Sequence, residues 1–202
     1  MKKKTLLIMT VVLGAIAFLG SCESDDNSTP TSKNKTIVID ATAYDTWTYF
    51  SFDADTVVAI SNFSTSTQWD IAFHRSDIRV NCGQSGPGNG GAFNFGKVDF
   101  ESVYEAPADG YSLNTTINIL ESYKMPPVYV TVPGDTLVSK WMTIVTSNTS
   151  APTYSYSDNI YAIRTASGKY AKIWLKDYFN DLGKSGHVTM TYKYQPSGSR
   201  VF

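Results

Sequence analysis

Short runs of β-branched and aromatic residues, separated by turn-forming residues, are the feature that most constrains the fold of this chain. The runs are 36–40, 46–52, 55–60, 69–73, 78–80, 116–120, 129–132, 141–145, 159–163, 170–175 and 187–194. Turn signals such as Pro107–Gly110 and Gly183–Gly186 lie between them, and no segment sustains the period of an amphipathic helix. This pattern predicts one all-β domain over 36–202, of sandwich or barrel-like architecture.

The composition favours an exported β protein and argues against a nucleic-acid binder. Aromatic residues make up 13% of the chain and charged residues only 17%, which is typical of an extracellular β domain. The formal net charge is −1, so the chain has no basic field to attract a phosphate backbone. Two cysteines and two histidines are too few for a disulfide scaffold or for most histidine-rich metal sites.

The N-terminus has the pattern of a bacterial lipoprotein signal. Three lysines at 2–4 precede an apolar stretch, 6–19, that is short for a transmembrane helix. The stretch ends in Leu19-Gly20-Ser21-Cys22, which resembles the lipobox in which the cysteine is lipidated. We therefore predict a signal peptide over 1–21, lipidation of Cys22 with acyl chains such as palmitate, and an outer-membrane anchor. The alternative is an ordinary secretory signal followed by a free cysteine.

The segment 22–35 is predicted to be a flexible tether. Acidic residues at 23–26 are followed by serine, threonine, asparagine and proline. An acidic cluster directly after the lipidated cysteine resembles the surface-export signal of Bacteroidota lipoproteins, which would place the protein on the cell surface. The alternative is a plain solvated linker.

Two further patterns are predicted to have structural roles and not to form a reactive or cofactor-binding site. With Cys22 lipidated, Cys82 has no partner, and we expect it to be a small buried hydrophobe. Gly86–Gly91 formally matches the dinucleotide fingerprint G-x-G-x-x-G, but the strand-like Ala92–Gly96 follows it instead of the helix that holds a pyrophosphate. We therefore predict a turned loop there.

His74 lies in an aromatic strand, three residues before Asp77. An isolated histidine in such a strand is typically a hydrogen-bonded structural residue, and we expect that here. The apolar alternation slips by one residue near Ser76 and Asp77, which predicts a turn or bulge. Neither a zinc hydrolase nor a Ser-His-Asp triad can be assembled, so we do not expect an enzyme.

A series of motifs occurs in the order found in a known family. The motifs are Tyr49–Phe52, Trp69–Arg75, Asp77–Gly86, Gly90–Ala92, Pro107–Tyr111, Ala151–Tyr154 and Ala171–Tyr178. Together they resemble the HmuY-like haem-binding lipoproteins of Bacteroidota over about 36–194. The resemblance implies a HmuY-like β-sandwich-type fold with haem as a non-catalytic ligand. It also implies a haemophore that takes haem from host haemoproteins and delivers it to a TonB-dependent outer-membrane receptor for iron acquisition.

The segments that would hold the haem iron depart from the family pattern. The family's prototype uses two histidines, one in the segment matching Tyr123–Tyr129 and one in the segment matching 142–151, and neither segment has a histidine here. Some relatives are thought to use methionines, which implies Met125 and Met142 as haem ligands, and Tyr129 is a further candidate through its phenolate. Met125 precedes two prolines and is therefore predicted to lie on a loop. Each of the three has a packing alternative, and for Met125 it is a gap-filling role in the core.

Two functions stay open at this point. The first is a haem-binding surface lipoprotein. The second is a family member that has lost haem ligation and binds another ligand or a partner protein. The missing histidines favour the second function, whereas Met125 and Met142 keep the first open.

Overall fold

The computed structural model describes residues 33–146 and 150–202. Over these residues the chain forms thirteen β-strands and two short 3₁₀ helices, which confirms the prediction of an all-β domain. The predicted signal peptide, Cys22 and nearly the whole predicted tether lie outside the described residues. No helix within the described part is long and apolar enough to cross a membrane.

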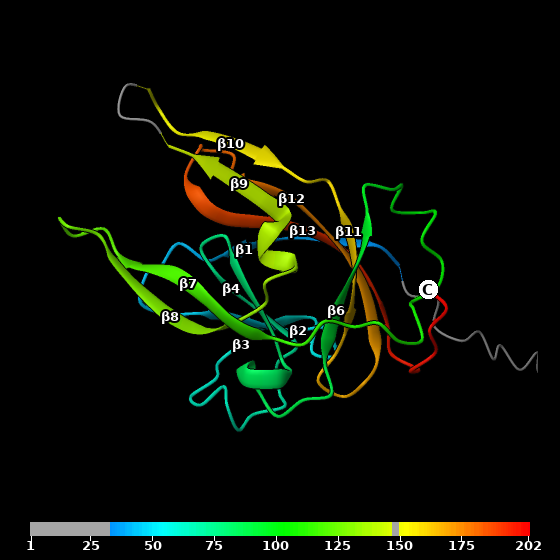
Figure 1. The fold of residues 1–202 in the computed structure, drawn as a ribbon. Coiled ribbons are helices and arrows are strands. Elements are labelled where there is room, and N and C mark those ends of the chain that lie inside the picture. The colour runs from blue at the N-terminus through cyan, green and yellow to red at the C-terminus, as the bar shows by residue number, and fades with distance from the viewer. Residues whose placement is uncertain (1–32, 147–149) are drawn as a thin grey trace, which may run out of the picture. The chain divides into compact units, whose positions relative to one another are not determined.

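The larger sheet has five antiparallel strands (Figure 1). Its order is β1 (Lys35–Asp40), β13 (Ser185–Gln195), β12 (Tyr170–Phe179), β11 (Ile160–Arg164) and β6 (Gly91–Gly96). Side chains of a strand alternate between its two faces. Val188 and Met190 of β13 are accordingly buried, whereas the alternating residues His187 and Thr189 are only partly covered. The sheet thus presents one continuous apolar face to the core.

The second sheet has four antiparallel strands. Its order is β3 (Thr56–Val58), β2 (Thr48–Ser51), β4 (Ile71–His74) and β5 (Asp77–Val80). Strands β4 and β5 form a hairpin whose two-residue turn contains Arg75 in the left-handed region, with φ of 55°. This confirms the turn predicted from the slip in the apolar alternation near Ser76 and Asp77.

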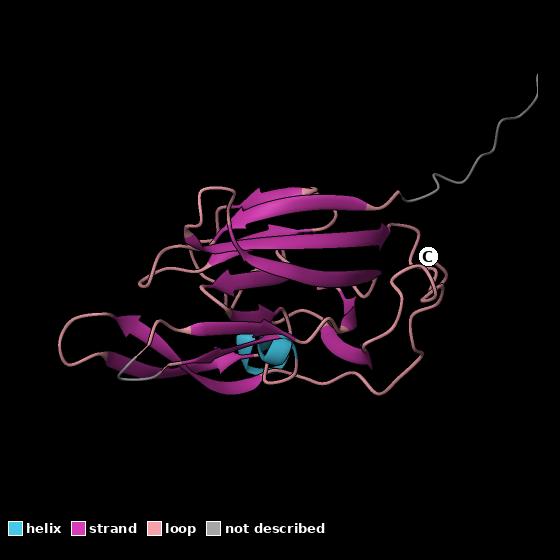
Figure 2. Cartoon of the chain, turned by 90° about the horizontal axis from the view of Figure 1, so that it is seen from above, coloured by secondary structure: helices cyan, strands magenta, loops and turns pink. Residues whose placement is uncertain are grey.

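Two hairpins complete the described fold, and both project to the same side of the domain (Figures 1 and 2). One consists of β7 (Thr115–Ser122) and β8 (Val128–Gly134), and the other of β9 (Met142–Val145) and β10 (Thr153–Tyr156). The 3₁₀ helix η2 (Val138–Trp141) connects them, and η1 (Gly83–Ser85) follows β5. The described strands of both hairpins therefore extend away from the main sheets (Figures 1 and 2).

The main hydrophobic core contains buried side chains from both sheets and from η2. Its largest members include Phe50, Phe52, Phe73, Trp141, Tyr161, Ile173 and Tyr192. Each is at most 2% exposed, so burial of these side chains is the main source of stability. Because the core is shared, the two sheets fold as one unit.

A buried asparagine holds the glycine-rich loop. The Nδ2 group of Asn81 donates hydrogen bonds to the carbonyls of Ser66 (2.9 Å) and Trp69 (2.8 Å), and its Oδ1 accepts one from the amide of Gly88 (3.0 Å). A Cβ atom at Gly86 would collide with the Asn81 side chain. Glycine is therefore needed at 86 for close approach, and the prediction of a turned loop is confirmed.

We predict that Asn81→Ala lowers the free energy of unfolding by about 2–4 kcal/mol, because it leaves the buried partners of Asn81 without hydrogen bonds. Urea denaturation followed by circular dichroism measures this change. Asn62→Ala is the control, since Asn62 is exposed and caps only a local turn, and we expect it to cost less than about 1 kcal/mol. An equal decrease in the free energy of unfolding in the two variants would contradict the conclusion that Asn81 holds the glycine-rich loop.

Asp135 is fully buried between β8 and η2. Its Oδ1 accepts hydrogen bonds from the amides of Leu137 (2.9 Å) and Val138 (2.7 Å), whereas its Oδ2 has no partner among the described residues. Burial raises the pKa of this carboxyl above its ordinary value of 3.8, against the lowering effect of the two amides. The folded state therefore holds the Asp135 proton more tightly than the unfolded state does.

This raised pKa predicts a pH-dependent difference from a variant that cannot titrate. The folded state favours the protonated form of Asp135, so this group adds to the free energy of unfolding at low pH. That contribution is lost as the pH rises through the pKa of Asp135 in the folded state. The stability of the wild type relative to Asp135→Asn should therefore fall between about pH 4 and pH 7, by about 1.4 kcal/mol for each unit by which the pKa is raised. Urea denaturation of both proteins at the two pH values measures the difference. A constant difference would contradict the raised pKa.

Candidate functional site

A cleft of about 230 Å³ lies where the two projecting hairpins meet the domain. The first hairpin contributes Leu120 and Tyr123, and the second contributes Ile144, Thr146, Pro152 and Tyr154. The base is formed by Tyr44, Arg75, Ser76, Asp77, Tyr178 and Ser185. The cleft therefore has apolar and aromatic walls and a polar base.

Arg75 is the cation at the base of this cleft. Its Nη1 donates hydrogen bonds to the carbonyls of Thr42 (3.1 Å) and Ser185 (3.2 Å), and its Nη2 donates to Oγ of Ser185 (2.8 Å). The guanidinium also lies over the rings of Tyr44, at 4.6 Å, and Tyr178, at 5.3 Å. These contacts hold the charge in one position. Asp77, which also lines the cleft, lies beside it in the β4–β5 hairpin.

The tyrosines at the base are held by contacts between their rings. Tyr44 meets Tyr123 of the first hairpin edge to face, with 5.2 Å between the ring centroids. Tyr178 lies 6.1 Å from Tyr154 of the second hairpin. Burial raises the pKa of Tyr44 and raises that of Tyr178 to about 12. Both phenols therefore keep their protons at neutral pH and offer hydrogen-bonding groups, not phenolate ligands.

The register of the first hairpin places Tyr129 on its cleft-facing side. Tyr129 of β8 lies directly opposite Leu120 of β7, and partners directly opposite in an antiparallel pair share a face. Leu120 lines the cleft, whereas the neighbouring pair Ile119 and Val130 lines a second cavity on the other side of the hairpin. The side chain of Tyr129 is 66% exposed, so a ligand can reach it.

Met125 lies in the loop between β7 and β8, as predicted. Its side chain is 90% exposed, so the alternative of a gap-filling core methionine is wrong. Met142, in contrast, is 7% exposed and belongs to the main core, as its packing alternative expected. It shares a face of β9 with Ile144 but lies two residues closer to the domain. Neither methionine lines the described cleft, so the structure does not bring the two together there.

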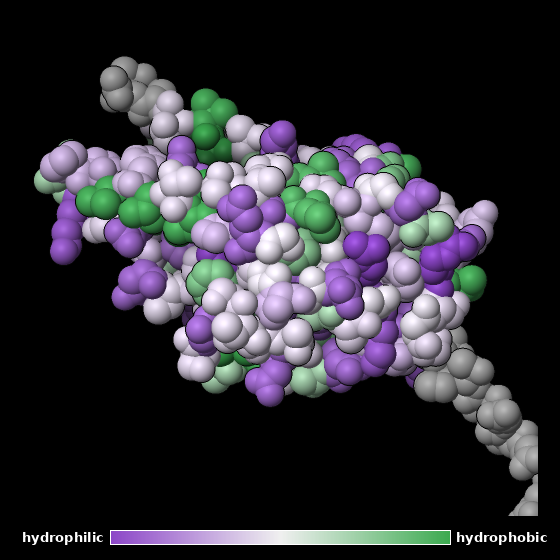
Figure 3. Space-filling view, turned by 60° about the horizontal axis from the view of Figure 1, so that its bottom comes forward, coloured by the Kyte–Doolittle hydropathy of each residue, from purple (hydrophilic) through white to green (hydrophobic). Residues whose placement is uncertain are grey.

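Exposed apolar side chains gather on the two hairpins (Figure 3). They are Tyr123, Met125, Val128 and Tyr129 on the first hairpin and Ile144 and Val145 on the second, all between 41% and 90% exposed. Such a grouping on a folded domain is typical of a surface that binds a ligand or a partner. It extends the apolar walls of the cleft toward the hairpin tips.

The other chemically suggestive residues are structural. His74 is 1% exposed, and its Nε2 lies 2.8 Å from the carbonyl oxygen of Tyr44, which confirms the predicted hydrogen-bonded role. Cys82 is buried, also as predicted, and burial raises the pKa of its thiol to about 11. Within residues 33–146 and 150–202, no three histidine, cysteine, aspartate or glutamate side chains are placed to hold a metal ion.

Taken together, these observations define an all-β domain with two projecting hairpins and a cleft at their base. The family model of HmuY protein matches residues 43–192. The chain belongs to the HmuY family. A search of curated proteins finds no match.

Solved structures show the same fold. One assigned to a HmuY-like haem-binding protein of Bacteroides vulgatus matches with a TM-score of 0.66 and 28% identity, covering 81% of this chain and 92% of that one. The apo HmuY analogue of Tannerella forsythia matches with a TM-score of 0.65 and 25% identity, covering 82% and 97%. A structure assigned to a lipoprotein of Bacteroides fragilis, with a TM-score of 0.63, 22% identity and coverage of 81% and 91%, shares the fold alone.

Sequence reasoning did not identify the base of the cleft. Arg75 stands in one of the family motifs, which is the only signal that pointed to it. Tyr178 also stands in a family motif, Ala171–Tyr178, whereas Tyr44 carries no signal of its own and reaches the cleft through the tertiary fold.

We predict that Gly186→Ala destabilises the protein more than Gly183→Ala does. Both glycines have positive φ, 87° and 72°, so both variants incur backbone strain of about 1–3 kcal/mol. A Cβ atom at Gly186 would also collide with the guanidinium of Arg75, whereas nothing lies within 4 Å of one at Gly183. Urea denaturation compares the two variants. Equal destabilisation would show that Arg75 is not held tightly at the base of the cleft.

Proposed function

We propose that this protein is an outer-membrane lipoprotein, anchored through Cys22 at the cell surface, that binds haem in the cleft between its two hairpins. In this proposal haem comes from host haemoproteins and is delivered to a TonB-dependent receptor for iron acquisition. The observation that carries the proposal is the cleft itself, with apolar walls from both hairpins and a fixed cation at the base. Membership of the HmuY family and the haem-binding relative of Bacteroides vulgatus support it.

The chemistry of the cleft suits a porphyrin, which is flat and apolar and carries carboxylates. Tyr123, Ile144 and Tyr154 provide the apolar surface, and the guanidinium of Arg75 is suited to a carboxylate. A volume of about 230 Å³ is below the range of about 300–1,000 Å³ that ligand pockets usually have. We therefore propose that only part of the ring enters the cleft and that the rest lies between the exposed hairpin walls.

Three residues are proposed as ligands of the haem iron, and they differ in how easily each can reach it. Met125 is exposed at the hairpin tip and is free to approach, and its thioether favours ferrous iron. Met142 is buried, so its ligation requires the base of β9 to open. Tyr129 is on the cleft-facing side of β8 and is the candidate phenolate ligand. In each case haem is cargo, so the proposal is a carrier and not an enzyme.

A haem titration of the chain without residues 1–21, carrying Cys22→Ser, tests the proposal. We expect a saturable Soret shift at one haem per chain, sharper after reduction with dithionite. Met125→Ala should abolish the low-spin spectrum of the reduced form, because the exposed thioether is removed. Met190→Leu is the matched control, because it replaces a buried core methionine that is not proposed to hold the iron. It should leave the spectrum unchanged, since leucine fills a similar volume in the core.

The other outcomes assign different ligands. An unchanged spectrum in Met125→Ala would overturn the assignment of Met125. A shift that is the same in both redox states and is lost in Tyr129→Phe would assign Tyr129. The absence of a saturable shift in either state would overturn haem binding itself.

The second candidate function is a HmuY-like surface lipoprotein that has lost haem ligation and binds another ligand or a partner protein. It is favoured by one specific observation, the absence of histidine from the sequence of both hairpins, 115–134 and 142–156. The exposed apolar side chains of the hairpins would then form the binding surface for the other ligand or partner.

A further inference from the structure

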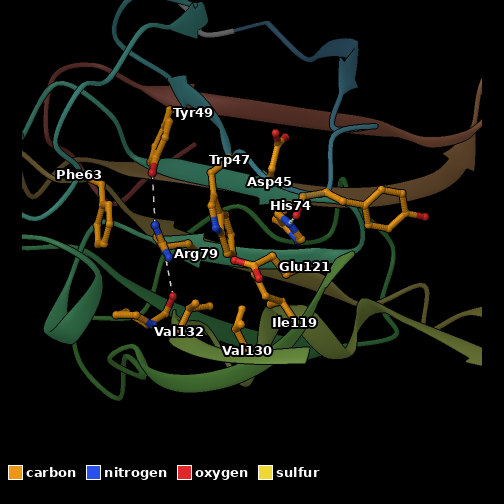
Figure 4. Close-up of a pocket in the computed structure, with 12 residues that line it drawn as sticks. Asp45, Trp47, Tyr49, Phe63, His74, Arg79, Ile119, Glu121, Val130 and Val132 are labelled. Atoms are coloured by element: carbon orange, nitrogen blue, oxygen red, sulfur yellow. Dashed lines mark hydrogen bonds between the residues drawn. The ribbon is translucent and has the colours of Figure 1, made fainter. Parts of the chain in front are cut away.

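A second cavity, of about 220 Å³, lies between the first hairpin and the four-stranded sheet (Figure 4). Trp47, Tyr49 and Phe63 form its wall on the side of the sheet, and Ile119, Val130 and Val132 form its wall on the hairpin. It lies on the opposite face of the hairpin from the haem cleft, and Tyr44 is the one residue that lines both.

A buried arginine lies in this cavity wall. Arg79 of β5 is 2% exposed, and its guanidinium is sandwiched between the rings of Trp47, at 4.0 Å, and Phe63, at 4.1 Å. Its Nε donates a hydrogen bond to the carbonyl of Pro133 (2.9 Å), and its Nη1 donates to the hydroxyl of Tyr49 (3.2 Å). Figure 4 shows the guanidinium between the two rings, with these two hydrogen bonds dashed.

This arginine has no counter-ion in the described part of the chain. None of the ion pairs found there includes Arg79, and no described group accepts a hydrogen bond from its Nη2. A guanidinium has five N–H donors in a fixed plane, so donors remain available on the edge that the rings leave uncovered. Burial of a charge without a partner is costly, and a carboxylate is the group whose geometry best matches a guanidinium edge.

The remaining lining residues restrict which carboxylate fits. Asp45 and Glu121 are exposed residues that also line the cavity, and neither forms an ion pair with Arg79 in the described structure. Their charges disfavour a ligand with only negative groups and suit a ligand that also carries an ammonium group. The apolar wall of Ile119 and Val130 suits a hydrocarbon side chain attached beside the two charged groups.

We propose that this cavity binds a small apolar zwitterion of the free amino acid type. The ligand's carboxylate pairs with Arg79, its ammonium group faces Asp45 and Glu121, and its hydrocarbon side chain packs against the hairpin. The site uses residues other than those proposed to bind haem, so the two proposals stand or fall separately.

Isothermal titration of the chain without residues 1–21, carrying Cys22→Ser, tests this site with three related probes. They are L-leucine, 4-methylpentanoate, which lacks the ammonium group, and 3-methylbutylamine, which lacks the carboxylate. We expect leucine to bind saturably, 4-methylpentanoate to bind about tenfold more weakly, and the amine not to bind, because each probe loses one charged contact. No binding of leucine at millimolar concentration, or binding of the amine as tight as that of leucine, would overturn the proposal.

Variants separate the site from a purely structural role of Arg79. Arg79→Met keeps a long apolar side chain without the charge and should lower the affinity for leucine at least about tenfold. Lys140→Met removes an exposed cation elsewhere and should leave the affinity unchanged. Glu121→Gln changes an exposed side chain, so it tests the site even if Arg79→Met does not fold. It should reduce the preference for leucine over 4-methylpentanoate, and an unchanged preference would overturn the placement of the ammonium group.

The haem titration of Arg79→Met gives an independent readout. Because Arg79 does not line the cleft between the hairpins, the Soret shift of this variant should equal that of the parent chain. Loss of leucine binding with an equal Soret shift supports two separate sites, whereas loss of both would overturn their separation.

Discussion

The carboxylate of Asp70 joins the two sheets of the domain, and both cavities depend on that connection. Its Oδ2 accepts a hydrogen bond from the amide of Phe52 (2.8 Å), which follows β2, and its Oδ1 accepts one from the amide of Ala166 (2.9 Å), which follows β11. Asp70 directly precedes β4, so it also fixes the β4–β5 hairpin that carries Arg75 and Arg79. Asp70 is 6% exposed, and this burial raises the pKa of its carboxyl in spite of these two donors.

Most strands were predictable because one face of each sheet is buried, which imposes alternation on the sequence. The exceptions have physical reasons. β10 (Thr153–Tyr156) alternates only between polar residues and tyrosine, and it pairs with β9 alone, outside the two main sheets. β12 continues to Phe179, beyond the predicted end at 175. Bulges near Asp177 shift the register with β13, so the strand continues although its alternation of apolar and polar residues is interrupted there.

The cleft was predictable only in its hairpins. The family motifs indicated Tyr123–Tyr129 and 142–151 as the relevant segments, and the structure places the described parts of both beside one cleft. Which residues face the cleft depends on strand pairing, which no local pattern reveals: Tyr129 faces it because Leu120 lies opposite. Met142 is buried because β9 begins directly after Trp141, a fully buried member of the core. Arg79 stands in the family motif Asp77–Gly86, but no sequence pattern indicates that its side chain is buried without a counter-ion among the described residues.

The buried thiol of Cys82 has a practical consequence. At 1% exposure and with a pKa of about 11, it remains protonated at neutral pH, and the thiol form is a poor nucleophile. Oxidants and alkylating reagents can therefore reach it only when the segment around the glycine-rich loop opens. With Cys22 replaced, Cys82 is the single thiol of the chain, and its rate of alkylation reports how often the folded domain opens in that region.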